Sequence, residues 1–443
     1  MSDDLHIEWQ PLDWFDRETG GELDRAFAAS ISVAVGGKYL TRLDDMGAHT
    51  VSNQVRASAW PLAVWLAANW WRLRWEPAPA EWRNDPDWRM AHCLAAAGGG
   101  YVWPNAIFAS DGDAVEILTK PKPSGPPYEP IRYINQIQAR ITTLEFEQKV
   151  DAFMEGVLGR RQTLQLAEDG LPGLWAEILN ERNDAEVTQQ RKLEAMAGFD
   201  PDQAPEAWLK NLLEDPDHLG RSALAEMVAE TRRDTGEIWE TIRELGRAGA
   251  QPKRGGFRVR VRELPKLPAA EVEHRPWQIG SDLARHARKH WDLGAKPIRN
   301  QTLAALLGAK AAVFSDHSTV ATPMPLGIRT EKSDTFDLYF NRPNPTTRRF
   351  AASRLLGDHL YFTKPERLLP ATHARTSRQQ FQRSFAQEFL CPIQALLEKI
   401  QTTQPDDDDF SEAAEYFHVS PQLVRTTLVN NNQLERDALT WAD

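Results

Sequence analysis

Tryptophan is distributed unevenly along this chain, and this distribution constrains the possible fold more than any other feature. Ten of the 16 tryptophans lie before residue 104. Aromatic side chains dominate the energetics of protein cores, so such a concentration predicts a local core. The densest group lies in apolar sequence and comprises Trp60, Trp65, Trp70, Trp71 and Trp75. We interpret these residues as core rather than as an exposed partner-binding surface, where tryptophan is also enriched.

Residues 1–161 are predicted to form this Trp-rich unit as an α+β domain. Two alternating stretches with Gly-containing turns, Ser30–Leu43 and Ala106–Lys120, predict β-hairpins. Apolar residues recur with helical spacing over Thr143–Arg161 and put Leu144 on the apolar face. Strands and helices are therefore both expected in this first unit.

The remaining chain divides by changes in pattern. Prolines punctuate short helical stretches over residues 162–250, which we predict to be a helical region. Residues 251–274 are predicted to be a basic linker or edge strand. Residues 275–443 are predicted to form a mostly α domain with a small sheet, in which the acidic run Asp406–Asp409 is a solvated loop. The fold class expected for the whole chain is α+β.

Charge and composition narrow the classes of function. The formal net charge is -11, which repels nucleic acid on average. No apolar run is long enough for a transmembrane helix, and the acidic N-terminus lacks the apolar segment of a secretory signal, so we expect no membrane partner. The two cysteines, Cys93 and Cys391, lie far apart and form no disulfide framework. These features predict a cytoplasmic protein.

Five segments of the last unit carry a resemblance to a known family. In chain order they are GSDLARHARKHWDLGAKPIRN (Gly280–Asn300), LAALLGAKAAVF (Leu303–Phe314), FDLYFNRPNPTTRRFAASRLLGDHLYF (Phe336–Phe362), FAQEFLCP (Phe385–Pro392) and AAEYFHVSPQLVRTTL (Ala413–Leu428). Their order and spacing resemble the ImmA/IrrE metallopeptidase family. The resemblance implies a zincin-like architecture and a setting in bacterial stress-response, mobile-element, toxin–antitoxin or phage-defence circuits, where the active family cleaves repressor proteins.

The residues at the expected zinc positions depart from the family pattern. The resemblance puts Arg354 and Asp358 where two zinc-binding histidines belong, and Leu355 where the general-base glutamate belongs. The third ligand is usually an acid in a stretch that here reads RQQFQR (Arg378–Arg383). A zincin needs imidazole ligands one helical turn apart and a carboxylate that accepts a proton from zinc-bound water. A guanidinium cannot bind a cation, and leucine cannot accept a proton.

The leading prediction is therefore a non-catalytic regulatory or recognition protein that binds a protein partner and no cofactor. Arg354 and Asp358 are four residues apart on one helix, so we hypothesise that an ion pair between them replaces the metal. The alternative for these two residues is simple exposure to solvent. The enzyme alternative is a zinc metallo-endopeptidase with displaced ligands, for which the candidates are His317, His359 and His373.

A third function, that of a nucleic-acid-binding adaptor, depends on a basic strip between the predicted units. Its residues are Lys253, Arg254, Arg258, Arg260 and Arg262. They could contact nucleic acid or an acidic partner. We favour a solvated edge strand that charge protects from aggregation, given the acidic chain. The two closing helices resemble a helix-turn-helix, but Arg425 is the single basic residue among the expected base-reading positions, which favours packing within the domain.

Overall fold

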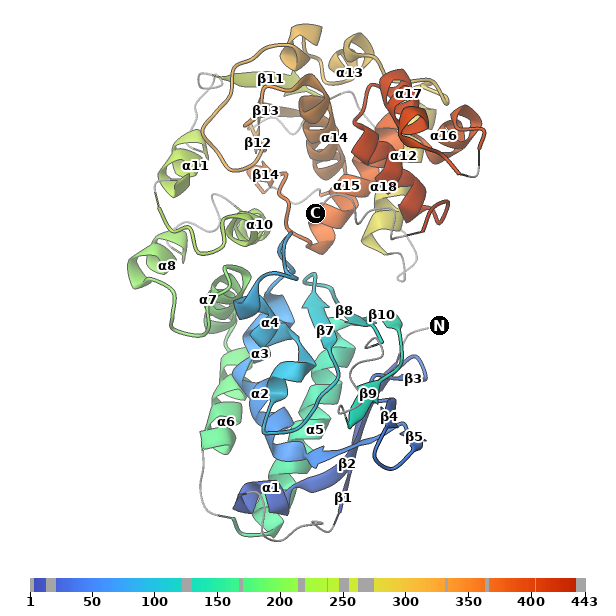
Figure 1. Ribbon diagram of the computed structural model, residues 1–443. Helices are drawn as coiled ribbons and strands as arrows, with labels where there is room; N and C mark the ends of the chain where they lie inside the picture. Colours follow the sequence, from blue (N-terminus) through green and yellow to red (C-terminus); the bar gives the residue numbers. More distant parts are fainter. Residues whose placement is uncertain are drawn as a thin grey trace. The chain divides into compact units, whose positions relative to one another are not determined.

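The computed structural model describes residues 4–12, 21–121, 130–166, 170–213, 220–236, 238–246, 255–261, 275–330, 334–362, 366–402 and 404–435. Contacts divide the chain into two compact units, Met1–Leu209 and Lys210–Asp443, and each is described by itself. The α+β class is confirmed, because helices alternate with strands that form four small antiparallel sheets in the described ranges (Figure 1). The division falls inside the predicted helical region, at α8 (Glu206–Leu213).

The strands of the first unit form three sheets. The first contains β1 (Leu5–Pro11), β2 (Ala28–Val35), β3 (Lys38–Tyr39) and β6 (Val55–Ser58), the second β7 (Ala106–Ser110), β8 (Ala114–Thr119) and β10 (Ile137–Thr142), and the third β4 (Leu43–Asp45), β5 (Thr50–Ser52) and β9 (Ile131–Tyr133). Both predicted hairpins are confirmed, as β2 pairs with β3 and β7 with β8. Gly36 and Gly37 both have positive φ angles, which the first of these two-residue turns requires.

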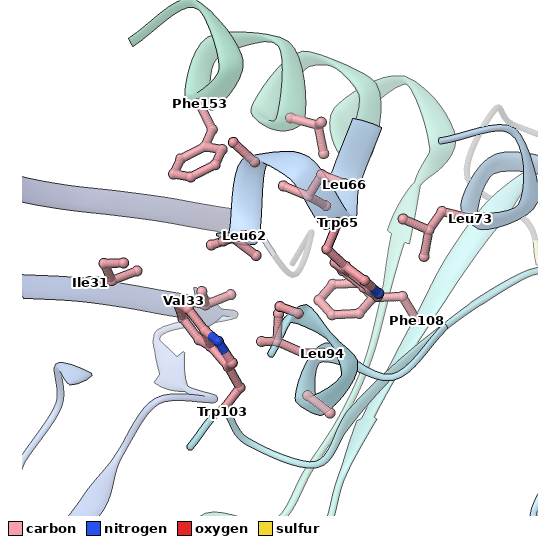
Figure 2. Close-up of a cluster of buried hydrophobic side chains, with 14 of the residues drawn as sticks. Ile31, Val33, Leu62, Trp65, Leu66, Leu73, Leu94, Trp103, Phe108 and Phe153 are labelled. Atoms are coloured by element: carbon pink, nitrogen blue, oxygen red, sulfur yellow. The ribbon is translucent and has the colours of Figure 1, made fainter. Parts of the chain in front are cut away.

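Helices of the first unit enclose the predicted aromatic core. They are α1 (Glu22–Ala26), α2 (Ala59–Ala68), α3 (Trp70–Trp75), α4 (Pro86–His92), the 3₁₀ helix η1 (Leu94–Ala97), α5 (Thr143–Thr163), α6 (Gly170–Asn183) and α7 (Ala185–Met196). Figure 2 shows Leu62 of α2 between Phe153 of α5 and Ile31 of β2. Four of the five clustered tryptophans are buried, with Trp75 packed against the core, so the core interpretation is confirmed. The prediction for Leu144 was wrong: it is 62% exposed, because it lies one residue outside the buried stripe.

The second unit packs helices against one sheet. Its helices are α10 (Arg221–Thr231), α11 (Ile238–Gly246), α12 (Pro276–His290), α13 (Asn300–Leu306), the 3₁₀ helix η2 (Ala311–Phe314), α14 (Pro345–Tyr361), α15 (Ser377–Leu390), α16 (Ile393–Lys399), α17 (Asp407–Phe417) and α18 (Pro421–Asn430). The sheet has the order β11 (Gly256–Arg260), β13 (Thr335–Tyr339), β12 (Leu326–Arg329) and β14 (Leu368–Pro370). No helix in the described ranges is long and apolar enough to cross a bilayer.

Two glycines let α15 approach its neighbours closely. A Cβ atom on Gly280 of α12 would lie 2.4 Å from the carbonyl oxygen of Phe381. A Cβ atom on Gly357 of α14 would lie 2.6 Å from the ring of Phe385. Both partners belong to α15, so any larger residue at either glycine would push this helix away. Gly357 therefore sets the short separation across which the polar residues of α14 and α15 meet.

The acidic run near the C-terminus differs from its prediction. Asp406 is the N-cap of α17, and its side chain accepts hydrogen bonds from the N–H groups of Asp408 and Asp409. Asp409 in turn accepts from the N–H group of Asp406. Negative charge stabilises the N-terminal turn of a helix, so the run begins a helix instead of forming a loop.

Candidate functional site

The residues at the positions where the resemblance puts zinc ligands meet at the contact between α14 and α15. Asp358 of α14 accepts two hydrogen bonds from Arg378 of α15, from Nη2 at 2.6 Å and from Nε at 2.9 Å. Both side chains are buried, with exposed fractions of 0% and 5%. Such a bidentate pair combines charge with a fixed geometry. Asp358, at the second predicted ligand position, and Arg378, in the stretch predicted to hold the third, are thus joined by an ion pair that crosses from one helix to the other.

The predicted ion pair between Arg354 and Asp358 was wrong, and so was its alternative of simple exposure. Arg354 is 6% exposed, and its Nη2 donates to the carbonyl of Thr372 at 2.6 Å and to Oε1 of Gln379. Its Nε has no hydrogen-bond partner among the described residues. Burial lowers the pKa of Arg354 to about 9. Asp358 pairs with Arg378 because α15 presents a guanidinium in bidentate geometry, which a neighbour on the same helix cannot match.

The residue at the general-base position contributes only to the core. Leu355 has no exposed surface and belongs to the cluster of apolar side chains that fills the second unit. Its neighbour on the same face, His359, packs against the ring of Phe336 at 5.0 Å between ring centres. Burial, together with the nearby charge of Arg329, lowers the pKa of His359 to about 4. Neither side chain is therefore placed to take a proton from a water molecule at Asp358.

Helix α10 completes the cluster with one of its faces. Ser222, Glu226 and Glu230 are spaced by four residues and so lie along one side of the helix. Ser222 accepts a hydrogen bond from Nη1 of Arg378 at 3.0 Å. Glu226 accepts one from the hydroxyl of Thr376 at 2.6 Å. This face is thus docked on the chain segment that enters α15.

The most exposed end of the cluster is the contact between Glu230 and His373. Glu230 accepts from the backbone N–H of His373 at 2.6 Å, and its other oxygen lies 2.7 Å from Nδ1 of the same residue. Burial would raise the pKa of Glu230, but hydrogen bonds from His373 outweigh burial and lower it. For Glu226 the balance is reversed: burial raises its pKa above the usual range, and the charge of Arg378 and the hydrogen bond from Thr376 only partly offset this. The two carboxylates of α10 thus lie in different environments.

Arg378 links three elements of the cluster through its guanidinium. Besides Asp358 and Ser222 it contacts Glu366, whose Oε2 lies 2.8 Å from Nη1. Burial alone would lower the pKa of Arg378, but the surrounding carboxylates, Asp358 above all, outweigh it and raise the pKa. Sequence reasoning missed Glu226, Glu230 and Glu366. The spacing of Ser222, Glu226 and Glu230 on an otherwise apolar helix was a signal that could have revealed the docked face.

The three histidines of the zinc alternative make separate contacts. His317 is exposed in the chain between η2 and β12, His359 packs on Phe336, and His373 pairs with Glu230. In the parts of the chain that the structure describes, no group of three or more His, Cys, Asp or Glu side chains is arranged to hold a metal ion. The described structure therefore does not bring these histidines together.

The basic strip is divided between described and undescribed residues. Arg258 pairs with Asp337, with Nη2 at 2.9 Å from Oδ2, and Arg260 pairs with Asp334 at 2.5 Å. Both arginines lie on β11, which is at one edge of its sheet. The contacts with Asp337 and Asp334 neutralise the two charges locally. The other members of the strip, Lys253, Arg254 and Arg262, lie outside the described residues.

The closing helices pack on the second unit. Val424 and Leu428 of α18 are buried in its core, together with Phe417 of α17. Arg425, the single basic residue at the predicted base-reading positions, pairs with Asp407 and lies over the ring of Phe410. These contacts favour a packing role for the pair.

The first unit contains a second buried polar cluster, which sequence reasoning missed. Glu76 accepts from Nε of Arg72 at 2.7 Å and lies 3.0 Å from Nε2 of His92. The other ring nitrogen of His92 lies 2.8 Å from the carbonyl oxygen of Phe108, and its ring stacks on Trp88. All side chains of this cluster are almost fully buried, so it joins α3 to α4 without offering a reactive group to solvent.

Comparison of the chain with protein-family models, with curated proteins and with solved structures found no match in any of the three. The resemblance to the ImmA/IrrE family therefore depends on the quoted segments alone.

Proposed function

We propose that this chain is a non-catalytic regulatory or recognition protein whose residues 275–443, within the second unit, form a degenerate ImmA/IrrE-like peptidase domain that binds a protein partner. The setting that fits is a cytoplasmic bacterial stress-response, mobile-element or phage-defence circuit. One observation carries the proposal: the ion pair between Arg378 and Asp358 occupies the converged ligand positions. The pair that stands for the metal in this proposal joins two helices and replaces the pair within α14 that the sequence predicted.

The chemistry of the cluster supports a loss of hydrolysis. Peptide hydrolysis by a zincin requires a metal-bound water and a carboxylate that accepts its proton. Both oxygens of Asp358 already accept hydrogen bonds from Arg378, and Leu355 has no acceptor atom. Arg354 is a cation that would repel a metal ion at the same place. The residues present therefore do not fit a zinc centre, whereas they do form a stable link between α14 and α15.

The proposal is tested by the metal content of the full chain purified from zinc-supplemented cells, together with its peptidase activity. We expect zinc well below one ion per chain and no cleavage of a denatured protein substrate that a chelator abolishes. A stoichiometric zinc ion, lost together with such an activity on chelation, would contradict the proposal and restore the enzyme alternative.

A further inference from the structure

Helix α10 fills a site whose other walls consist of hydrogen-bond donors. The backbone N–H and ring of His373, the hydroxyl of Thr376 and the guanidinium of Arg378 all face this helix. Ser222, Glu226 and Glu230 supply the acceptors. The helix also packs beside β14, as Figure 1 shows. A surface with this pattern of donors selects for carboxylates.

The balance of charge indicates that the carboxylates of α10 are required as partners for the guanidinium groups of the cluster. Five guanidinium groups interact electrostatically in or beside the cluster, those of Arg329, Arg354, Arg375, Arg378 and Arg383. Among the described residues, the chain from α14 to α15 contributes the carboxylates of Asp358 and Glu366 to these interactions. Glu226 and Glu230 of α10 supply two further carboxylates, and both interact with Arg354 and Arg383. Buried charges without partners are costly, so a site lacking α10 would need another acidic ligand.

The ends of α10 show that it is a separate segment held by docking. Gly220 precedes it with a φ of 93°, and Arg232 follows it with a φ of 48°. Both values lie in the left-handed region, so the helical path ends at each side. A helix of 11 residues is marginal in water by itself. The contacts of Glu226 and Glu230 are therefore part of what keeps α10 helical and in place.

We infer that α10 is an internal ligand, and that the site it occupies binds an acidic helical segment of a partner protein with two carboxylates one turn apart. This inference rests on the proposed function as a protein-binding module. It adds to that function the chemistry of the partner segment, which is acidic, and a regulatory step, which is the release of α10. The partner segment competes with α10, so binding requires α10 to leave the site. In the free chain α10 covers the electropositive site. The site becomes accessible when the partner segment displaces α10.

The experiment uses the full chain and a labelled peptide with the sequence of Gly220–Arg232. The wild-type chain is compared with the double variant E226Q/E230Q, which keeps the shape of both side chains and removes their charge. The matched control is E240Q/E244Q, where two exposed glutamates of α11 have the same spacing. Peptide binding is measured by fluorescence anisotropy, and release of α10 by hydrogen–deuterium exchange of its amides.

We expect amides of α10 to exchange roughly tenfold faster in E226Q/E230Q, and the peptide to bind this variant roughly tenfold more tightly than it binds wild type. The control variant should behave as wild type. A peptide carrying glutamine at both acidic positions should lose this binding. Equal binding of the acidic and the glutamine peptides, or unchanged exchange of α10 in the variant, would overturn the inference.

The single variant E230Q keeps the test decisive if the double variant does not fold. Glu230 lies at the more exposed end of the cluster, with 12% of its side chain exposed, and Glu226 remains buried. In E230Q we expect faster exchange in the last turn of α10 and tighter peptide binding, and wild-type behaviour in both would overturn the inference. Zinc content is measured separately, so failure of the proposed function is distinguishable from failure of this inference.

Discussion

The pairing of Asp358 shows how far helical spacing alone determines a contact. Arg354 lies four residues before it, and an exposed pair at this spacing contributes only about 0.2–0.5 kcal/mol. Arg378 reaches the same carboxylate from another helix with two hydrogen bonds in a buried place. The sequence predicted that residues 354, 358 and 378–383 belong to one site. It could not predict which guanidinium pairs with Asp358, because that depends on the packing of α15.

The substitution Arg378→Met should lower the free energy of unfolding by about 3–5 kcal/mol, since it leaves the charge of Asp358 buried without its partner. The double variant R378M/D358L should lose much less, because no buried charge remains. Denaturant unfolding of the wild type, R378M, D358L and the double variant measures the coupling. A double variant that is less stable than R378M would show that the cost does not come from the orphaned charge.

His359 should make stability depend on pH in a window set by its burial. Its pKa falls from 6.5 to about 4 in the folded chain, so the unfolded chain binds the proton more readily. The contribution is fully present above pH 6.5 and is lost as the pH falls towards 4. The variant H359Q should lack this part of the pH dependence, worth about 2–3 kcal/mol. Unfolding free energies between these pH values test it, and parallel curves for variant and wild type would contradict it.

Among the elements, those with strong local signals were predicted best. The hairpins formed by β2 with β3 and by β7 with β8 follow from alternation and glycine turns, and α5 covers the predicted helical range Thr143–Arg161. The apolar sequence that holds the five clustered tryptophans forms two helices, α2 and α3, because the backbone bends at Asn69. The docking of α10 was missed, since its partners lie more than a hundred residues away in the chain.

Close packing between α12 and α15 predicts an unusual cost for a conservative change. Gly280→Ala improves helix propensity, yet its Cβ would meet the backbone oxygen of Phe381 at 2.4 Å. We expect a net loss of about 1–3 kcal/mol in unfolding free energy. The control is Gly159→Ala in α5, where nothing lies within 4 Å, and it should stabilise the chain by up to about 1 kcal/mol. Similar effects of the two changes on thermal unfolding would contradict this account of the packing.

At the scale of the whole molecule, the two units have separate cores and separate buried polar clusters. In the first, Glu76 and His92 lie among tryptophans, while in the second Asp358 and Arg378 join two helices. Composition predicted the first core, because tryptophan is concentrated there. The second cluster could be located only through the resemblance, and its contacts follow from tertiary packing that no local pattern encodes.

The central claim is that an internal ion pair, and not a metal ion, holds α14 to α15. A ligand that binds only the folded state raises its melting temperature, so thermal unfolding of the full chain in chelator and in excess zinc tests the claim directly. We predict the same melting temperature in both conditions. A melting temperature that falls in chelator, recovers with zinc and loses this response when Asp358 is replaced by asparagine would contradict the account.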